Sequence, residues 1–594
     1  MEHRKVLKSG EFLVDEVDAN DIFIPEEFNE EQLMIAETIK DFLAAELYPH
    51  LDQIDSPDIE LMKTILKKSG DLGLMGISLP EEYGGFGQDF VTQMLAAETV
   101  GAGYSFSVAF MAHCGIGTLP IMYYGDENQR QRYVTKLATG EFLGAYCLTE
   151  PGAGSDANSG KTQARLSEDG THYILTGQKM WITNANFADL QTVFAKIDND
   201  RVLSAFIVER NYPGVVISPD EKKMGIKGSS TAQIFYNDVK VPVENLIGKR
   251  GEGFRIALSI LHMGRIKLGA NVLGAAKKAI DDSVQYANER KQFGVLISTF
   301  GAIKHKLAEQ VIRTFALESA IYRVSKDIDR QIDLNKAEGV DKGRAAIEGI
   351  SHYAVEAAIL KVFGSEVLDF VIDEAVQIHG GMGYSAEMAV ERGYRDSRIN
   401  RIFEGTNEIN RLLVVDTAMK RGMKGDFDLA GKAGALKSNL EHVAEKGVNG
   451  EGYYEEKMRI LRNFKKAILL VMNGASTTFC RQLVHEQEVL NNLSDMITEI
   501  YVAESTTLRV KKMESLKGEA AIAVYRQILD VLVYDSGSRI EKNGLDAINS
   551  FAAGEEAQGL ITAIKILSTV KGVNVKVARR VIADKLIEDN GYKF

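Results

Sequence analysis

The chain has only three cysteines in 594 residues, and their positions exclude the sites that cysteine usually builds. Cys114, Cys147 and Cys480 lie far apart, without a Cys-x-x-Cys pair or a histidine at zinc-ligand spacing. We therefore expect no disulfide framework and no metal site. A reducing compartment fits this cysteine usage best.

Basic charge and long apolar runs are also scarce. The net charge of -13 argues against a nucleic-acid partner, because phosphate recognition needs a basic surface. No apolar run reaches the roughly 18 residues of a membrane span. The N-terminal stretch MEHRKVLKSGEFLVDEVDAND has no apolar core and is too acidic for a transit peptide. These absences predict a cytoplasmic protein without a targeting segment.

The period of the apolar residues changes three times along the chain, which is too long for one core. Residues 31–145 show helical spacing, and short β-branched or aromatic runs follow from 146. Long helical patterns return at 253, and a Gly-, Lys- and Glu-rich stretch after about 425 is typical of a linker. The sequence predicts a mainly α protein with an N-terminal helical domain (1–145), a β domain (146–252), a helical bundle (253–424), and a linker with an extra C-terminal helical domain (425–594).

Two matches to the dinucleotide fingerprint GxGxxA, at 152–157 and 381–386, lack the strand-turn-helix context that the fingerprint needs. The first match leads into strands and the second lies in a helical region. A Rossmann-type site is therefore not expected.

Four other stretches allow both a structural and a ligand-binding interpretation. AYCLTEPGAGSD is either an ordinary Gly-rich turn or a loop whose Thr149 and Ser155 meet polar atoms of a ligand. The single tryptophan, Trp181, is more often core filler than a platform for a flat aromatic ligand. Arg290 either complements a helix dipole or meets a pyrophosphate. In QIHGGMGYS the paired glycines can cap a helix, and His379 has no partner at metal-ligand spacing.

Taken in order, these motifs closely resemble the acyl-CoA dehydrogenase family. The matching stretches are YCLTEPGAGSD, WITN, VPVENLIG with GEGF, ERKQFG, QIHGGMGY and RIFEGTNEINR, over about residues 30–420. The helical tail and phrases such as FIVER and IFEGTNEI look most like the very-long-chain branch, which has an extra C-terminal helical domain. The resemblance implies that family's fold, FAD as cofactor, a fatty acyl-CoA as substrate and an electron-transferring flavoprotein as electron acceptor.

The resemblance also assigns the carboxylate of RIFEGTNEINR. A thioester's α-proton is weakly acidic, so the reaction needs a placed base and a stabilised carbonyl oxygen. In this family the base is the Glu of the Phe/Tyr-Glu-Gly-Thr motif, here Glu404, and Glu408 one turn on is the competing carboxylate. Some members carry the base on the long helix, but the residues here, LHMGR, include no acid.

The remaining site residues follow from the resemblance alone. Cofactor contacts are implied for Tyr146, Leu148, Thr149, Gly154, Ser155, Trp181, Ile182, Thr183, Arg290, Gln292, Phe293, Phe300, Gln377, Ile378, His379, Gly380, Gly381, Thr406, Asn407 and Glu408. Substrate contacts are implied for Ser155, His262, Arg265, Phe403 and Gly405, although His262 and Met263 depart from the Asn-rich pattern of the very-long-chain branch. Because the family's FAD lies across a subunit interface, a homo-oligomer is implied, and the extra domain favours a homodimer.

The C-terminal region adds one ambiguity. Residues 457–476 place Ile460, Leu461, Phe464, Ile468 and Val471 on one helical face, with basic residues mostly elsewhere. Such a helix either packs on protein, which we favour, or lies on an anionic membrane as a peripheral contact. Two other functions also remain open, an acyl-CoA oxidase and a non-catalytic assembly protein of the same fold.

Overall fold

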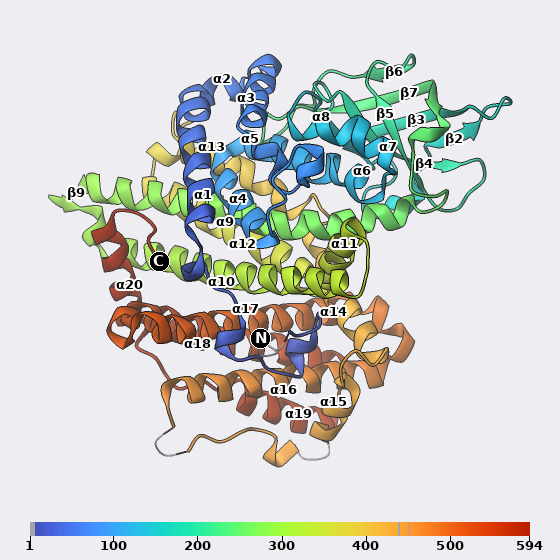
Figure 1. The fold of residues 1–594 in the computed structure, drawn as a ribbon. Helices are drawn as coiled ribbons and strands as arrows, with labels where there is room; N and C mark the ends of the chain where they lie inside the picture. The colour runs from blue at the N-terminus through green and yellow to red at the C-terminus, as the bar shows by residue number, and fades with distance from the viewer. Residues whose placement is uncertain (1–5, 57, 438–439, 449–450) are drawn as a thin grey trace.

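The computed structural model describes residues 6–56, 58–437, 440–448 and 451–594. The first helical group lies beside the sheet (Figure 1). Two of these helices begin at residues that favour a helix N-terminus, since Asn29 and Asp89 cap α1 and α4 with their side-chain oxygens. The group comprises α1 (Glu30–Phe42), α2 (Leu51–Asp55), α3 (Ile59–Asp71), α4 (Phe90–Val100), α5 (Tyr104–Met111), α6 (Leu119–Tyr124), α7 (Glu127–Gln129) and α8 (Thr135–Ala138).

The predicted strands form one sheet in the order β6-β7-β3-β2-β4-β5-β8, with β1 pairing parallel to β4. The sheet is mostly antiparallel, and β4 is buried along nearly its whole length, which explains its continuous apolar run LQTVFAKI. The strands are β1 (Gly144–Cys147), β2 (Gln163–Leu166), β3 (His172–Thr183), β4 (Leu190–Ile197), β5 (Ser204–Glu209), β6 (Val215–Ile217), β7 (Thr231–Pro242) and β8 (Leu246–Ile247).

Long helices form the predicted bundle, and a short hairpin, β9 (Lys291–Gln292) and β10 (Val295–Leu296), separates the first two. The helices α9 and α12 pack closely because Gly269 and Gly364 leave room for each other's helix. The bundle helices are α9 (Gly253–Glu289), α10 (Gly301–Ala337), α11 (Lys342–His352), α12 (Ala354–His379), α13 (Ala389–Ser397) and α14 (Asn407–Met423).

The C-terminal helices lie against α10 and α14 of the bundle (Figure 1). The linker prediction was wrong for residues 429–437, which form α15 (Leu429–Lys437) and pack against α16. Its Gly-rich composition hid a helix that tertiary contacts stabilise. The other helices are α16 (Tyr453–Phe479), α17 (Gln487–Lys517), α18 (Ala523–Phe551), α19 (Gly554–Leu567) and α20 (Val575–Asp589). The domain boundaries proposed from the sequence stay a prediction.

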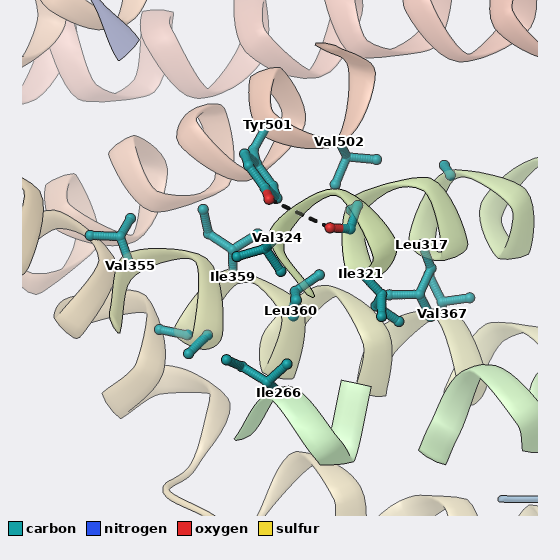
Figure 2. Close-up of a cluster of buried hydrophobic side chains, with 14 of the residues drawn as sticks. Ile266, Leu317, Ile321, Val324, Val355, Ile359, Leu360, Val367, Tyr501 and Val502 are labelled. Atoms are coloured by element: carbon teal, nitrogen blue, oxygen red, sulfur yellow. Dashed lines mark hydrogen bonds between the residues drawn. The ribbon is translucent and has the colours of Figure 1, made fainter. Parts of the chain in front are cut away.

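Apolar packing joins the C-terminal domain to the bundle. In Figure 2, side chains of α9, α10, α12 and α17 form one continuous cluster, which includes Ile321, Ile359 and Val502. The Tyr501 hydroxyl on α17 donates to the carbonyl oxygen of Ala320 on α10 at 3.5 Å. Each fully buried aliphatic side chain contributes about 1.5–3 kcal/mol, so this layer holds α17 in the same core as the bundle.

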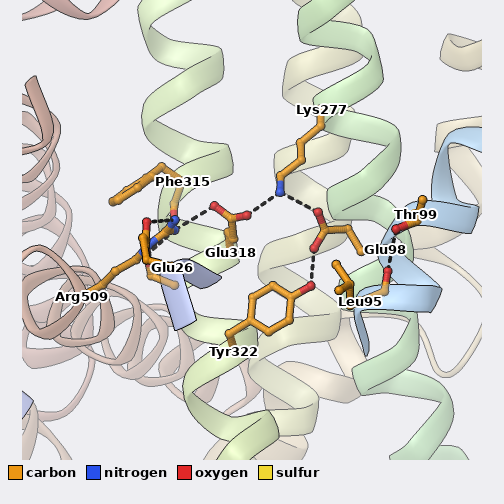
Figure 3. Close-up of polar contacts among 10 residues, drawn as sticks. Glu26, Leu95, Glu98, Thr99, Lys277, Phe315, Glu318, Tyr322 and Arg509 are labelled. Atoms are coloured by element: carbon orange, nitrogen blue, oxygen red, sulfur yellow. Dashed lines mark hydrogen bonds and ion pairs between the residues drawn. The ribbon is translucent and has the colours of Figure 1, made fainter. Parts of the chain in front are cut away.

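A buried chain of charges also crosses this boundary (Figure 3). Arg509 of α17 pairs with Glu318 of α10 at 2.8 Å and with Glu26 of the N-terminal segment at 2.8 Å. Lys277 of α9 then bridges Glu318 to Glu98 of α4. These pairs tie the N-terminal segment, the bundle and the C-terminal domain together at one place.

The amphipathic stretch 457–476 lies inside α16, and its apolar face is buried within the chain itself. Ile460, Leu461, Phe464, Ile468 and Val471 are all buried. Two of its basic side chains are also buried, since Lys457 pairs with Asp530 and Lys465 pairs with Glu504. Packing on protein, the interpretation that we favoured, is confirmed for this face, which leaves it no surface for a membrane.

Two segments, Phe90–Tyr124 and Gly253–Glu289, are long and apolar enough to cross a membrane by length and composition. The first includes α4 to α6 and the second is α9, and most of each is buried inside the protein. Core helices of this kind pass the same test, so the finding carries little weight.

Candidate active site

Glu404 lies in a sharply turned loop between α13 and α14. Its φ of +57° is unusual for a residue with a side chain, and Gly405 follows at +82°. Arg265 Nε donates to the Glu404 carbonyl oxygen at 3.3 Å. Asn410 Nδ2 donates to the carbonyls of Gly405 and Thr406 at 2.8 and 3.0 Å. These bonds hold the loop in a conformation that costs about 1–3 kcal/mol and is common at active sites.

The Glu404 carboxylate is enclosed but only partly paired. Oε2 is buried and has no hydrogen-bond partner among the described residues. Burial raises the pKa of Glu404 to about 7, although Arg265 and Lys361 act to lower it. A carboxylate that titrates near neutral pH without a partner is suited to accept a proton from a ligand. Glu408, in contrast, is exposed, and its pKa is lowered.

Two cationic side chains lie near the Glu404 carboxylate. Arg265 and Lys361 are both buried, and Lys361 Nζ donates to Asn407 Oδ1 at 2.7 Å. Burial lowers the pKa of Lys361 to about 7, opposed by the Glu404 charge. Beside them, burial and Arg265 lower the pKa of His262 to about 3, so its imidazole is neutral and faces Arg265 Nη1 at 3.3 Å.

The loop after β1 lies on the other side of the site. The Tyr146 hydroxyl is buried without a partner in the described chain, and burial and the Glu404 charge raise its pKa well above its usual value. Glu150 anchors the loop, since its carboxylate pairs with the fully buried Lys179 at 2.7 Å. The Thr149 carbonyl accepts from Met180 N at 2.9 Å. A Cβ at Gly154 would meet nothing within 4 Å, so space lies above this loop for a ligand.

Trp181 is not core filler. Its side chain is 52% exposed, and the residue sits at a bulge of β3 with φ +59°. Ile182, its neighbour, is buried, and Thr183 pairs with Thr231 of β7. The bulge turns the indole toward solvent, where it is available to a flat ligand. The fit of this side to a flavin therefore rests on Trp181 and the unpaired Tyr146 hydroxyl.

A second group of predicted cofactor residues lies at the other end of α9. Arg290, Gln292 and Phe293 belong to the β9–β10 hairpin and are exposed, with the Phe293 ring 94% exposed at φ +53°. Phe300 packs edge to face with Phe293. Along one helix Arg265 and Arg290 are about 37 Å apart, at 1.5 Å per residue. The structure therefore places the predicted residues in two groups that cannot meet at one flavin ring within a chain.

Gln377 to Gly381 join this second group. His379 stacks on Tyr286, near the end of α9, with ring centroids 4.2 Å apart, and its Nδ1 faces the Ala375 carbonyl oxygen at 2.7 Å. Gln377 and the two glycines are exposed, whereas Ile378 and His379 are buried. Contacts of Ile378 and His379 with a cofactor would therefore come from the backbone.

The other predicted site residues differ in what their side chains contact. Thr406 caps α14, since its hydroxyl accepts from Ile409 N at 3.3 Å. The Asn407 side chain turns away from the cleft into α12. Leu148 and Phe403 pack against the hydrophobic core, and Ser155 is exposed on its loop.

A small, largely apolar cleft of about 60 Å³ lies between α5, α9, α12 and α13. Asn400, four residues before Glu404, lines it. The apolar walls include Val108, Val272, Ala275, Leu368 and Ile372. In the part of the chain that the structure describes, no group of three His, Cys, Asp or Glu side chains could hold a metal ion.

Family models match along most of the chain. The acyl-CoA dehydrogenase N-terminal domain matches residues 29–141, the middle domain 145–239 and the C-terminal domain 251–419. A second model, also described as an acyl-CoA dehydrogenase C-terminal domain, matches 463–566. A probable acyl-CoA dehydrogenase of Bacillus subtilis (strain 168) is 41% identical over 99% of this chain and 98% of its own length. The chain belongs to the acyl-CoA dehydrogenase family.

Acyl-CoA dehydrogenases are FAD-dependent oxidoreductases, and the other comparisons agree. The human mitochondrial very long-chain specific acyl-CoA dehydrogenase is 38% identical over 89% of this chain and 81% of its own. A crystal structure of an acyl-CoA dehydrogenase from Bacillus anthracis, complexed with FAD, superposes with TM-score 0.95 and 43% identity over 99% of this chain and 100% of that one. The butyryl-CoA dehydrogenase of Megasphaera elsdenii covers 66% of this chain and 99% of its own, at TM-score 0.58 and 35% identity.

The structure adds residues that the sequence analysis missed. Gly264, Lys361 and Asn410 surround Glu404, and Lys179 holds the loop that carries Glu150. Of these, only Gly264 had a signal, since it sits in LHMGR, where related enzymes can carry the base. Lys361 lies in an ordinary apolar helix pattern, so its burial beside Glu404 could not be inferred from its neighbours.

Proposed function

We propose that this acyl-CoA dehydrogenase converts a fatty acyl-CoA to its trans-2-enoyl-CoA as a step of fatty acid β-oxidation. The observation that carries the proposal is the buried Glu404 carboxylate, which has an unpaired oxygen and a pKa raised to about 7. Asn400, four residues before Glu404 in the chain, lines an apolar cleft into which an acyl chain would extend.

The base loop supplies the groups that proton abstraction needs. Glu404 Oε2 accepts the substrate's α-proton, and the loop geometry fixes its direction. The Glu404 backbone N–H donates to no acceptor within the described residues, so it is free to stabilise the negative charge on the thioester oxygen. Gly405 has no side chain to occupy the adjoining space, where a Cβ would lie 3.1 Å from Asn410 Nδ2.

FAD, when bound, supplies the acceptor for the β-hydride. Tyr146, Thr149, Ser155 and the exposed face of Trp181 would hold its flavin end, opposite the base. As the family resemblance implies, Ser155 and His262 would contact the CoA part of the substrate.

The second group of cofactor residues supports a homodimer. Phe293, at the tip of its hairpin, is 94% exposed and is therefore accessible to a second subunit. Because it lies about 37 Å of helix from the base, it would reach the cofactor of a neighbouring subunit. Arg290 and Gln292 beside it would meet the polar part of that cofactor.

The acyl chain, which we propose to be of medium to very long length, would enter the apolar cleft between α9 and α12. The electrons would pass to an electron-transferring flavoprotein.

An acyl-CoA oxidase is the second candidate because Trp181 exposes one edge of the site to solvent. Rapid mixing of the reduced enzyme with air separates the two, since an oxidase reoxidises during turnover and a dehydrogenase does so far more slowly.

The deciding experiment is an anaerobic titration of the FAD-loaded protein with acyl-CoAs of four to twenty carbons. We expect the visible flavin absorbance to bleach with one range of lengths, and not in Glu404→Gln. Glu168→Gln, which removes an exposed carboxylate in the turn between β2 and β3, is the control and should bleach as the wild type does. If no acyl-CoA bleaches bound FAD in the wild type, the catalytic proposal fails and a binding or assembly role takes its place.

A further inference from the structure

We propose that Asp495 of the C-terminal domain is a positioning residue for the base Glu404. The inference rests on the proposed role of Glu404. Asp495 acts through a chain of charged and amide side chains that runs from α17 through α14 and α12 to the base loop. It lies outside the family match that ends at residue 419, in the segment that the second C-terminal model covers.

The first link crosses the boundary between the C-terminal domain and the bundle. Arg411 Nε, on α14, donates to Asp495 Oδ1 at 2.7 Å. The other two nitrogens of the same guanidinium face Glu366 of α12, with Nη2 to Oε2 at 3.0 Å and Nη1 to Oε1 at 2.9 Å. Arg411 therefore bridges two carboxylates from two different helices, and Asp495 fixes the plane of its guanidinium.

The second link runs from Glu366 to the residue that begins α14. Asn407 Nδ2 donates to Glu366 Oε1 and to Ser365 Oγ, both at 3.0 Å. At the other end of the amide, Asn407 Oδ1 accepts from Lys361 Nζ at 2.7 Å. A carboxylate on one side and an ammonium on the other leave this amide only one orientation. Asn407 is 2% exposed, so water cannot replace either partner.

The third link is the loop itself. Asn407 is three residues after Glu404, and Glu404 and Gly405 both have positive φ. A strained backbone persists only where its surroundings over-determine it. The loop is tied by Arg265 and Asn410 on one side and by Asn407 on the other. Loosening Arg411 frees Glu366 and then Asn407, and a shift of the base of about 1 Å can cost 10²-fold in rate.

A second ion pair crosses the same boundary without reaching the base. Arg579 of α20 donates to Glu309 of α10 at 2.7 Å, and its side chain is 14% exposed, against 18% for Arg411. Glu309 and Asp495 line the same cavity of about 230 Å³. Within the described residues, the side-chain partners of Glu309 are Arg313 and Arg579, and no hydrogen bond or ion pair links Glu309 to the loop of Glu404. Glu309→Gln is therefore a matched control for Asp495→Asn, because each turns one inter-domain carboxylate into its amide.

The test compares full-length, FAD-loaded variants by the rate of anaerobic flavin bleaching over a range of acyl-CoA concentrations. For Asp495→Asn we expect the limiting rate to fall about tenfold, with the half-saturating concentration within about twofold of the wild type. Glu309→Gln should keep the limiting rate within about twofold, even if its melting temperature falls by as much as that of Asp495→Asn. Asp495→Glu, which restores the charge, should recover at least half of the wild-type rate.

Equal limiting rates in Asp495→Asn and Glu309→Gln would overturn the inference, as would a loss seen only in the half-saturating concentration or in FAD content. If Asp495→Asn does not fold, Arg411→Lys gives the same decision, because an ammonium cannot bridge two carboxylates with a planar fork. A wild type that no acyl-CoA bleaches would overturn the proposed function and this inference together. A wild type that bleaches normally confines any failure to the inference.

Discussion

Gly264 on α9 faces the carboxylate of Glu404 so closely that no larger residue fits between them. A Cβ at Gly264 would lie 2.9 Å from Glu404 Oε2 and 3.1 Å from its Cδ. Real Cβ atoms do not approach this closely without a shift of one partner. The long helix therefore leaves a gap in its surface where the base loop enters, and the two elements must be considered as one site.

Gly264→Ala tests this relationship. The added methyl would push the Glu404 carboxylate away from the position that its loop sets, so we expect the rate of flavin bleaching to fall at least about tenfold. Thermal stability should change little, because helix propensity favours alanine by about 1 kcal/mol. Gly434→Ala, at a helical glycine where a Cβ meets nothing within 4 Å, is the control and should keep full activity.

The pKa of Glu404 predicts the pH dependence of the reaction. Only the carboxylate form accepts a proton, so the bleaching rate should rise with pH through about 7. Lys361 lowers this pKa and titrates in the same range, so the rise belongs to the pair. In Lys361→Met the cation is lost, and the rise should move to higher pH by about one unit. A rise at the same pH in wild type and Lys361→Met would show that another group controls the bleaching rate. Glu168→Gln, at an exposed carboxylate outside the site, is the control that should leave the pH of the rise unchanged.

The sequence predicted elements well where local pattern and tertiary environment agree. The strands β3, β4 and β7 and the helices α9 and α10 begin within a few residues of their predicted starts, since apolar period and turn residues both marked them. The linker prediction was wrong for residues 429–437 because their glycines favour a linker, whereas Leu429 and Ala433 are buried in the hydrophobic core. In this segment, tertiary packing outweighs the low helix propensity of the glycines.

The candidate site was predictable only in its parts that carry motifs. Glu404 came from a family resemblance, and the structure gives its physical setting. The partners that set this environment, such as Lys361 and Asn410, are far apart in sequence or have no distinctive neighbours. For Trp181 the general preference of tryptophan for the core gave a wrong prediction, because a bulge in β3 leaves its side chain exposed.

The buried charges around Arg509 predict a large loss of stability. Arg509→Met leaves the carboxylates of Glu318 and Glu26 with fewer partners in a buried place, which costs about 3–5 kcal/mol when one partner of such a pair is removed. We expect the midpoint of urea unfolding to fall accordingly. Lys542→Met is the control, because its pair with Asp546 is exposed and is worth about 0.5 kcal/mol or less. If the urea midpoint of Arg509→Met were as high as that of Lys542→Met, the charge network around Arg509 would add little to stability.

The exposed hairpin at the end of α9 predicts how subunits share the cofactor. Phe293→Asp places a charge on the side chain that we propose to enter a neighbouring subunit, where burial of an unpaired carboxylate is unfavourable. We expect the dimer to weaken in light scattering and the bound FAD per chain to fall by at least half, while the melting of the isolated chain changes little. Leu166→Asp, at an exposed apolar residue of the sheet, should affect neither property. Loss of the dimer with full retention of FAD would contradict a shared site, because the two properties are coupled only if the hairpin contacts the neighbour's cofactor.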